Sequence, residues 1–318
     1  MVLLAPRVST GVGAAFAKVL KAASALEEVE IRLGSAHWGR DFDPLGVPVR
    51  TALQRLDLRS FEVVAERTVF DVRHFAELLA SWPELQVLKC ACFDLLHASV
   101  YSEDQPARAA FPVSFPPNLH TLHLGSEVLR YMNTAMMKLF RTPSGSRLRN
   151  LCLINMPLLQ DDFPPFLNAL GQVAPHLRSL TLIARHRQML HEPPLSIDVI
   201  FPRLTSAVAL HLDLRILNES TVLSSLLPLV LQHALRVIFL APMVDWDDLS
   251  NYTTRLRADD MLDFLAGVRP GSGASRPPRS PLRFILVGQI SQAWTRQEIA
   301  TVKEVADREG SGIELYLA

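Results

Sequence analysis

The chain has 318 residues, of which 49% are hydrophobic and 20% are charged, and its 32 basic residues balance its 32 acidic ones. This composition is typical of a well-packed globular chain and excludes a disordered one. A nucleic-acid-binding protein would show a basic excess, so we expect no nucleic-acid partner.

Three cysteines are too few for a disulfide framework. The first residues lack the basic, apolar and small-residue order of a secretory signal. The longest apolar run, 223–235, is interrupted by Pro228, Gln232 and His233, and a membrane span needs roughly 20 uninterrupted apolar residues. We therefore expect a cytoplasmic or nuclear protein that makes no membrane contact.

One short pattern recurs along the chain, with apolar residues at positions 1, 4 and 6 of a six-residue segment. The first copy, LEEVEI, begins at Leu26, and LRSLTL at Leu177 is among the clearest. Further copies begin at Leu53, Leu85, Leu119, Leu148, Leu235 and Leu282, and weaker ones at Ala207 and Gly310. The spacing of about 30 residues lies in the range of long leucine-rich repeats.

Helix-like segments separate these copies, because their apolar residues recur every three or four positions. Phe75, Leu78 and Leu79 show this spacing in one of them. The predicted helices are 14–25, 72–81, 134–140, 164–173, 220–232, 259–267 and 296–308. The alternation predicts an α/β leucine-rich-repeat solenoid with parallel strands on a concave face and helices on a convex face. We expect one horseshoe-shaped array of about ten repeats over residues 1–318.

Several helices lead into the next strand through a proline, as in Trp82-Pro83-Glu84-Leu85 and in the segment APHL at 174–177. This order, a helix followed by P-x-L-x-x-L-x-L, resembles the leucine-rich portion of F-box/leucine-rich-repeat proteins, particularly the fungal ones, over essentially the whole chain. The resemblance implies substrate recognition for a ubiquitin ligase. No F-box is recognisable in these residues, so a ligase adaptor is expected as a partner only if an F-box lies upstream.

Two segments depart from the regular repeat. Residues 2–8 resemble residues 238–244, which predicts a strand that begins at position 4 of an earlier repeat. We infer that the array begins within a repeat. The segment GVRPGSGASRPPRSP at 267–281 is rich in glycine, proline, serine and arginine and predicts a mobile insertion loop. It is either a tolerated surface insertion or a phosphorylatable contact site.

The residues at positions 3, 5 and 7 of each strand should face the concave surface, because side chains alternate along a strand. We expect a charged amino-terminal rim, a polar middle and an apolar anchor near the carboxyl end. The candidate partner-binding residues are Arg55, Asp57, Arg59, His123, Thr181, His211, Val237, Phe239, Phe284 and Leu286. Exposed apolar residues often mark an interface. Two alternatives are that the insertion covers the anchor, or that a register shift of one residue returns it to the core.

Catalytic, cofactor and metal motifs are weak. The G-x-G of Gly11 and Gly13 resembles a dinucleotide-binding turn, but Phe16 occupies the third small position, so we interpret it as a loop before the first helix. Cys90 lies at a core position, which disfavours a zinc site with Cys92. His123 and Cys152 should be neighbours on adjacent strands, which keeps a cysteine-dependent enzyme as one alternative.

The sequence therefore predicts a non-enzymatic protein-interaction module without cofactor or metal, which binds a protein partner on its concave face. A second alternative is a structural array or fragment that assembles through its open ends.

Overall fold

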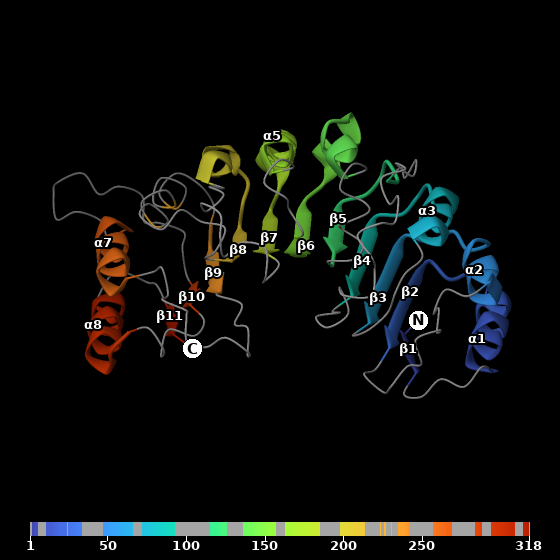
Figure 1. Cartoon of the computed structure of the whole chain (residues 1–318), viewed down its shortest axis with the longest axis horizontal. Coiled ribbons are helices and arrows are strands. Elements are labelled where there is room, and N and C mark those ends of the chain that lie inside the picture. The colour runs from blue at the N-terminus through green and yellow to red at the C-terminus, as the bar shows by residue number, and fades with distance from the viewer. Residues whose placement is uncertain are drawn as a thin grey trace, which may run out of the picture. The chain divides into compact units, whose positions relative to one another are not determined.

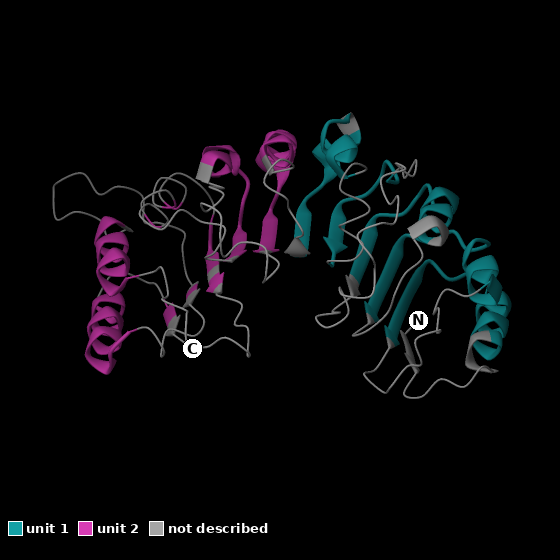
Figure 2. Ribbon diagram, in the orientation of Figure 1, with its two compact units in different colours: residues 1–157 teal, residues 158–318 magenta. Residues whose placement is uncertain are grey.

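The computed structural model describes residues 2–5, 11–23, 25–33, 47–65, 72–92, 115–125, 136–156, 163–184, 198–213, 223, 226, 230, 235–241, 257–268, 284–287, 294–308 and 314–317 (Figure 1). The chain divides into two compact units, which Figure 2 shows in different colours. Unit 1 is Met1–Pro157 and unit 2 is Leu158–Ala318.

Unit 1 alternates strands with helices. Its strands are β1 (Val2–Ala5), β2 (Glu28–Leu33), β3 (Ser60–Ala65), β4 (Val87–Cys92), β5 (Thr121–Leu124) and β6 (Asn150–Met156). Its helices are α1 (Gly11–Ala22), α2 (Val47–Leu53), α3 (Val72–Ser81) and the 3-10 helix η1 (Pro143–Arg147), and residues 136–140 are also helical. The strands pair in chain order, and each described pair is parallel. Helices α1, α2 and α3 lie on one face of these strands (Figure 1).

Unit 2 has the same organisation. Its strands are β7 (Ser179–Ala184), β8 (Ala209–Asp213), β9 (Val237–Ala241), β10 (Phe284–Val287) and β11 (Glu314–Leu317). Its helices are α5 (Phe163–Val173), η2 (Ala174–His176), η3 (Asp198–Arg203), α7 (Ala258–Val268) and α8 (Arg296–Asp307). Strands β7 to β11 also pair in chain order and in parallel. Both units are thus α/β with parallel strands, and the predicted fold class is confirmed at this level.

The core of each unit lies between the strands and the helices. In β5, Leu122 and Leu124 are fully buried, whereas Thr121 and His123 are half-buried. Positions 4 and 6 are buried in the other strands too, with Val29, Ile31, Phe61, Val63, Leu88, Cys90, Leu151, Leu153, Leu180, Leu182, Leu210, Leu212, Ile238, Leu240 and Ile285. Burial of each large apolar side chain of this kind stabilises the folded state by about 1.5–3 kcal/mol. We call the opposite side, which carries positions 3, 5 and 7, the open face.

A recurring turn leads into the strands. The position 1 amide donates to the carbonyl three residues earlier, as from Leu85 to Trp82 (3.2 Å), from Leu119 to Pro116 (3.4 Å) and from Leu177 to Ala174 (3.2 Å). Proline fixes its own φ and cannot continue a helical ladder, so it suits this turn. The predicted helix–proline–strand order is therefore how these strands begin.

The second predicted strand is wrong. Residues 47–53 form α2, residues 54–55 form a turn, and the strand is β3 at Ser60–Ala65. The predicted rim residues Arg55 and Asp57 lie in the connection between α2 and β3, and Arg59 precedes β3, where it pairs with Glu27 (Nε to Oε2 3.5 Å). The segment LQRLDL has leucines at positions 1, 4 and 6, but LRSFEV, which begins at Leu58, has apolar residues there too and forms the strand. None of the three rim residues is on the open face of a strand.

Two terminal registers also differ from prediction. Val2 pairs with Glu30, so it stands at position 5 rather than the predicted position 4. Glu314 pairs with Phe284 at position 3, and Tyr316 takes position 5 beside Leu286. The weak copy predicted at Gly310 therefore begins two residues later, because few strong apolar residues define it.

Helix boundaries differ mainly at the amino end. Helix α1 begins at Gly11, so Gly11 and Gly13 are helical and do not form the predicted loop. Burial of Phe16 and Leu20 favours the helix over the weak propensity of glycine. Leu223, Leu226 and Val230 are helical, as predicted, and the other residues of 220–232 lie outside the described ones. The predicted insertion at 267–281 overlaps the end of α7, which extends to Val268. Residues 269–281 of this insertion also lie outside the described residues.

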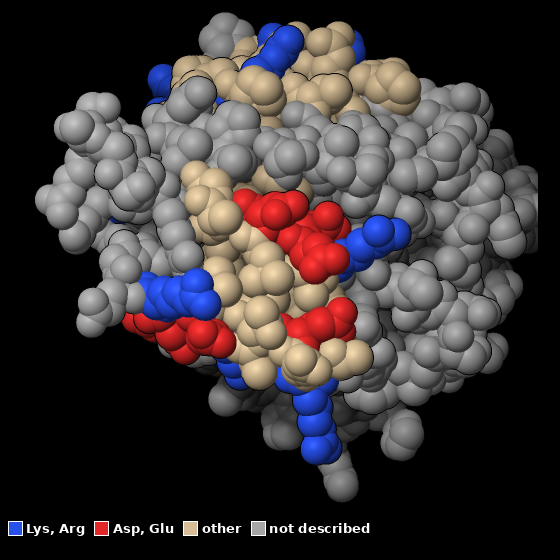
Figure 3. All heavy atoms as spheres, turned by 90° about the vertical axis from the view of Figure 1, so that its left-hand side faces the viewer, with Lys and Arg blue, Asp and Glu red and all other residues tan. Residues whose placement is uncertain are grey.

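Helix α8 is more polar than the other described helices. Its buried residues are Val302 and Ala306, while Lys303, Glu304 and Asp307 are exposed. The Thr295 hydroxyl accepts a hydrogen bond from the Glu298 amide, which caps the helix. Figure 3 shows lysine, arginine and acidic side chains interspersed over this side of unit 2.

Within the residues that the structure describes, no helix combines the length and the apolar character that crossing a bilayer requires.

Candidate functional site

The open face of unit 1 carries a line of polar residues at position 5. The register places Glu30 beside Glu62, Glu62 beside Lys89, Lys89 beside His123, and His123 beside Cys152. We call these five residues the polar ladder. Neighbouring strands lie about 4.8 Å apart, so the side chains form one continuous row.

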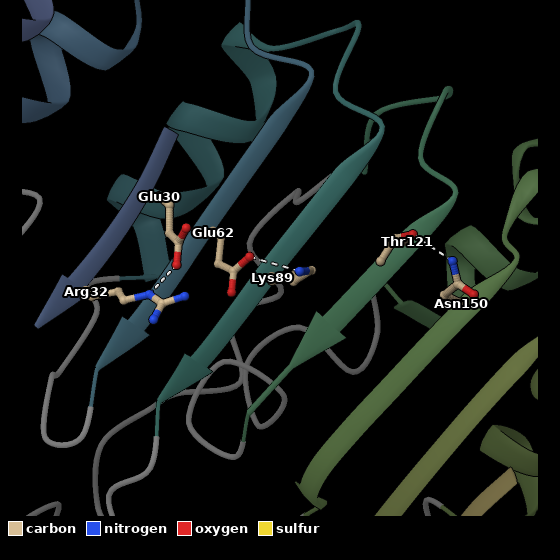
Figure 4. A network of polar contacts seen from close by, with 6 residues as sticks. All are labelled: Glu30, Arg32, Glu62, Lys89, Thr121 and Asn150. Atoms are coloured by element: carbon tan, nitrogen blue, oxygen red, sulfur yellow. Dashed lines mark hydrogen bonds and ion pairs between the residues drawn. The ribbon is translucent and has the colours of Figure 1, made fainter. Parts of the chain in front are cut away.

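Ion pairs join the charged part of the polar ladder (Figure 4). Lys89 Nζ lies 2.9 Å from Glu62 Oε2, and these side chains are 38% and 24% exposed. Arg32, two residues along β2, contacts the Glu30 carboxylate. Pairs exposed to this degree contribute only about 0–1 kcal/mol to stability, because water and salt screen them. They therefore orient charges on the surface more than they hold the fold.

The next two strands add uncharged hydrogen-bonding groups at position 3. Asn150 Nδ2 donates to Thr121 Oγ1 at 3.0 Å across β5 and β6, as Figure 4 shows. The ring of His120 lies 3.1 Å from the same hydroxyl. All three side chains are half-buried. This part of the open face can exchange hydrogen bonds with a polypeptide backbone without carrying net charge.

His123 stands between the charged and the uncharged parts of this face. Burial lowers the pKa of its imidazole below the ordinary value, the Lys89 ammonium lowers it further, and the Glu62 carboxylate partly opposes both. The ring is therefore neutral at neutral pH. Its Nε2 is buried and has no hydrogen-bond partner among the described residues.

The predicted neighbourhood of His123 and Cys152 is confirmed by the strand register. Nucleophilic catalysis by such a pair also needs a group that orients the histidine and donors for a developing oxyanion. No described neighbour in the polar ladder orients the His123 ring through Nε2. Within the described residues, no group of three or more histidines, cysteines or acids is arranged to hold a metal ion.

The open face of unit 2 brings the other predicted residues together by register. Thr181 pairs with His211, and His211 pairs with Phe239. Val237 pairs with Phe284, and Phe239 pairs with Leu286. The backbone thus places the four predicted anchor residues in one block of two adjacent strands. The side chains of Phe239, Phe284 and Leu286 lie outside the described ones, and that of Val237 is half-buried.

Glu62 is the charged residue that the sequence prediction missed. It occupies position 5 of β3, where Asp57 was expected. The segment LRSFEV carries the signal, with a phenylalanine and a valine in place of two leucines. The segment LQRLDL, which begins five residues earlier, meets the same pattern, so the pattern alone does not select LRSFEV.

In comparisons with known proteins, no family model matches the chain, and no curated protein matches its sequence.

Proposed function

We propose that the chain is a non-enzymatic protein-interaction module that binds a protein partner on its open face. In this proposal the two units belong to one leucine-rich-repeat array of about ten repeats, with the open face lining the concave side of a horseshoe. The observation that carries the proposal is the alternation of burial at positions 3 to 6 of strands β2 to β9, wherever their side chains are described. Positions 4 and 6 are buried, whereas the polar ladder remains accessible with its charges held at defined places.

The partner is expected to carry charged, polar and apolar groups in an order that complements the order on the open face. Opposite Glu30 and Glu62 it should carry basic groups, and opposite Thr121 and Asn150 it should carry backbone or amide groups. Such complementarity sets orientation and association rate, while apolar contacts supply most of the affinity. The block of Val237, Phe239, Phe284 and Leu286 is the proposed apolar contact.

The F-box resemblance extends this proposal to a class of partner. If an F-box belongs to the same gene product, the bound protein is a ubiquitination substrate and the adaptor of the ligase binds upstream. The helix–proline–strand order of the repeats supports this extension. Co-purification of a cullin-type adaptor with the full gene product, absent after deletion of the upstream region, tests it.

Capture of the partner from an extract of the source cells tests the main proposal. Glu62→Lys reverses a charge on the open face, and Glu77→Lys makes the same change on α3, where Glu77 pairs with Arg50 (Oε2 to Nε 3.6 Å). Each variant loses one ion pair, so the two are matched. We expect Glu62→Lys and the double variant Phe239→Ala/Phe284→Ala to lose the partner and Glu77→Lys to keep it. Equal capture of the partner by all variants would reject the open face as the binding site.

A second candidate function is assembly of copies through the ends of the array. It is favoured by Val19 on α1 and Val47 on α2, which are 47% and 63% exposed. These two helices contact each other in unit 1. The exposed residues of α8 are mostly polar, so assembly through the carboxyl end is less favoured. Light scattering of wild type against Val19→Lys tests it, because only assembly through α1 predicts a fall in mass.

A further inference from the structure

A groove in unit 2 lies between α5 and η3, which are helical elements and no part of the open face. Its volume is about 300 Å³, and it is lined by Pro164, Leu167, Asn168, Gly171, Val199, Ile200 and Arg203. Val199 is 63% exposed, which is high for a large hydrophobic side chain. Ligand sites of proteins begin at about this volume, and most of their lining is apolar.

One end of the groove is cationic. The Arg203 side chain extends from η3 to α5, where its Nη1 donates to the Gly171 carbonyl at a long 3.4 Å. This position depends on glycine, because a Cβ at residue 171 would lie only 2.8 Å from that nitrogen. The guanidinium therefore lies at the groove, where η3 contacts α5 through this hydrogen bond.

The cation has hydrogen-bonding capacity to spare. A guanidinium has five N–H donors, and the carbonyl of Gly171 uses one of them. Among the described residues, no carboxylate forms an ion pair with Arg203, and the nearby Asn168 amide is exposed. A fork of donors beside an apolar floor matches a planar carboxylate next to an aliphatic side chain.

We propose that this groove is a second docking site, which binds a segment of a partner protein carrying an aliphatic side chain beside a carboxylate. The aliphatic group lies against Leu167 and Val199. The carboxylate accepts hydrogen bonds from Arg203 and from the Asn168 amide. The groove belongs to helical elements of unit 2 and shares no residue with the open face.

Methyl-resolved NMR of the full chain tests this proposal with two blocked tetrapeptides, Leu-Asp-Leu-Glu and its uncharged counterpart Leu-Asn-Leu-Gln. We expect the acidic peptide to shift the methyl signals of Leu167, Val199 and Ile200, and the uncharged peptide to bind about tenfold more weakly. Arg203→Gln should weaken the binding of the acidic peptide by about tenfold, because a charge-assisted hydrogen-bond pair is lost. Arg257→Gln removes another exposed arginine of unit 2 and should change nothing.

Gly171→Ala separates the position of the cation from its presence. The new methyl group displaces the flexible end of Arg203, and alanine favours the helix. We expect weaker binding of the acidic peptide, unchanged binding of the uncharged one, and no loss of thermal stability. Equal binding of both peptides by the wild type, or an equal loss in Arg257→Gln, would overturn the carboxylate assignment. Absence of any shift in the methyl signals of these three residues would overturn the groove itself.

Discussion

Lys89 and Glu62 form an ion pair across β4 and β3, with Nζ 2.9 Å from Oε2, at the centre of the open face of unit 1. The two residues are lateral neighbours in the strand register. The pair therefore fixes where a positive and a negative charge stand, beside the uncharged hydrogen-bonding groups of β5 and β6.

Exchanging the two charges should preserve the fold and change recognition. Glu62→Lys and Lys89→Glu should each lower the free energy of unfolding by up to about 1 kcal/mol, and the double variant should recover most of it, because an exposed pair is weak. Urea denaturation measures all three. A loss of 3 kcal/mol or more in a single variant would mean that the pair supports the core instead.

His123 should make stability depend on pH. Its folded pKa lies below the ordinary 6.5 of the unfolded chain, so the unfolded state takes up the proton first as the pH falls. The wild type should therefore lose stability relative to His123→Gln below about pH 6.5, and the loss should level off below the folded pKa. Urea denaturation of both proteins at pH 7.5 and 5.5 measures the difference. A variant with the same pH dependence as the wild type contradicts this role.

Two adjacent residues of β5 should behave in opposite ways. Leu122 is fully buried, so Leu122→Ala should cost about 2–5 kcal/mol of stability. Thr121 lies on the open face, and Thr121→Ala should cost about 1 kcal/mol or less while it weakens partner binding. Thermal denaturation and partner capture on both variants compare the two faces. Similar costs for both substitutions would mean that the alternation is misassigned.

Trp82 links the end of helix α3 to the end of helix α2 in the preceding repeat. Its Nε1 donates to the Leu53 carbonyl at 3.1 Å, and its ring packs on Phe61 with centroids 4.8 Å apart. Trp82→Phe keeps an aromatic ring but removes the donor, so we expect a loss of about 1–3 kcal/mol in the free energy of unfolding. Chemical denaturation measures it, and an unchanged midpoint would show that the bond is replaced by water.

The sequence could predict most strands because burial imposes a period of two. Leucines such as Leu122 and Leu180 are completely excluded from solvent, and polar substitutions there would be costly. The same pattern could not separate Leu53 from Leu58, since both begin segments with apolar residues at positions 1, 4 and 6. The structure selects Leu58 because residues 47–53 form α2, whose first turn accommodates Pro48.

The candidate site was only partly predictable for the same reason. The place of His123 beside Cys152 followed from two clear copies of the pattern, and the register confirms it. The ion pair of Glu62 with Lys89 required the correct register of β3, where the apolar residues are Phe61 and Val63. The groove at Arg203 depends on how η3 packs against α5, which no local pattern encodes.

Protection of lysine side chains tests the binding face most directly. Lys89 is on the open face, whereas Lys18 and Lys21 lie on α1, Lys138 lies in the helical residues 136–140, and Lys303 lies on α8. Acetylation of the complex with its captured partner, read by mass spectrometry, should show Lys89 protected and the four helical lysines as reactive as in the unbound protein. Unchanged reactivity of Lys89 together with protection of a helical lysine would contradict the account.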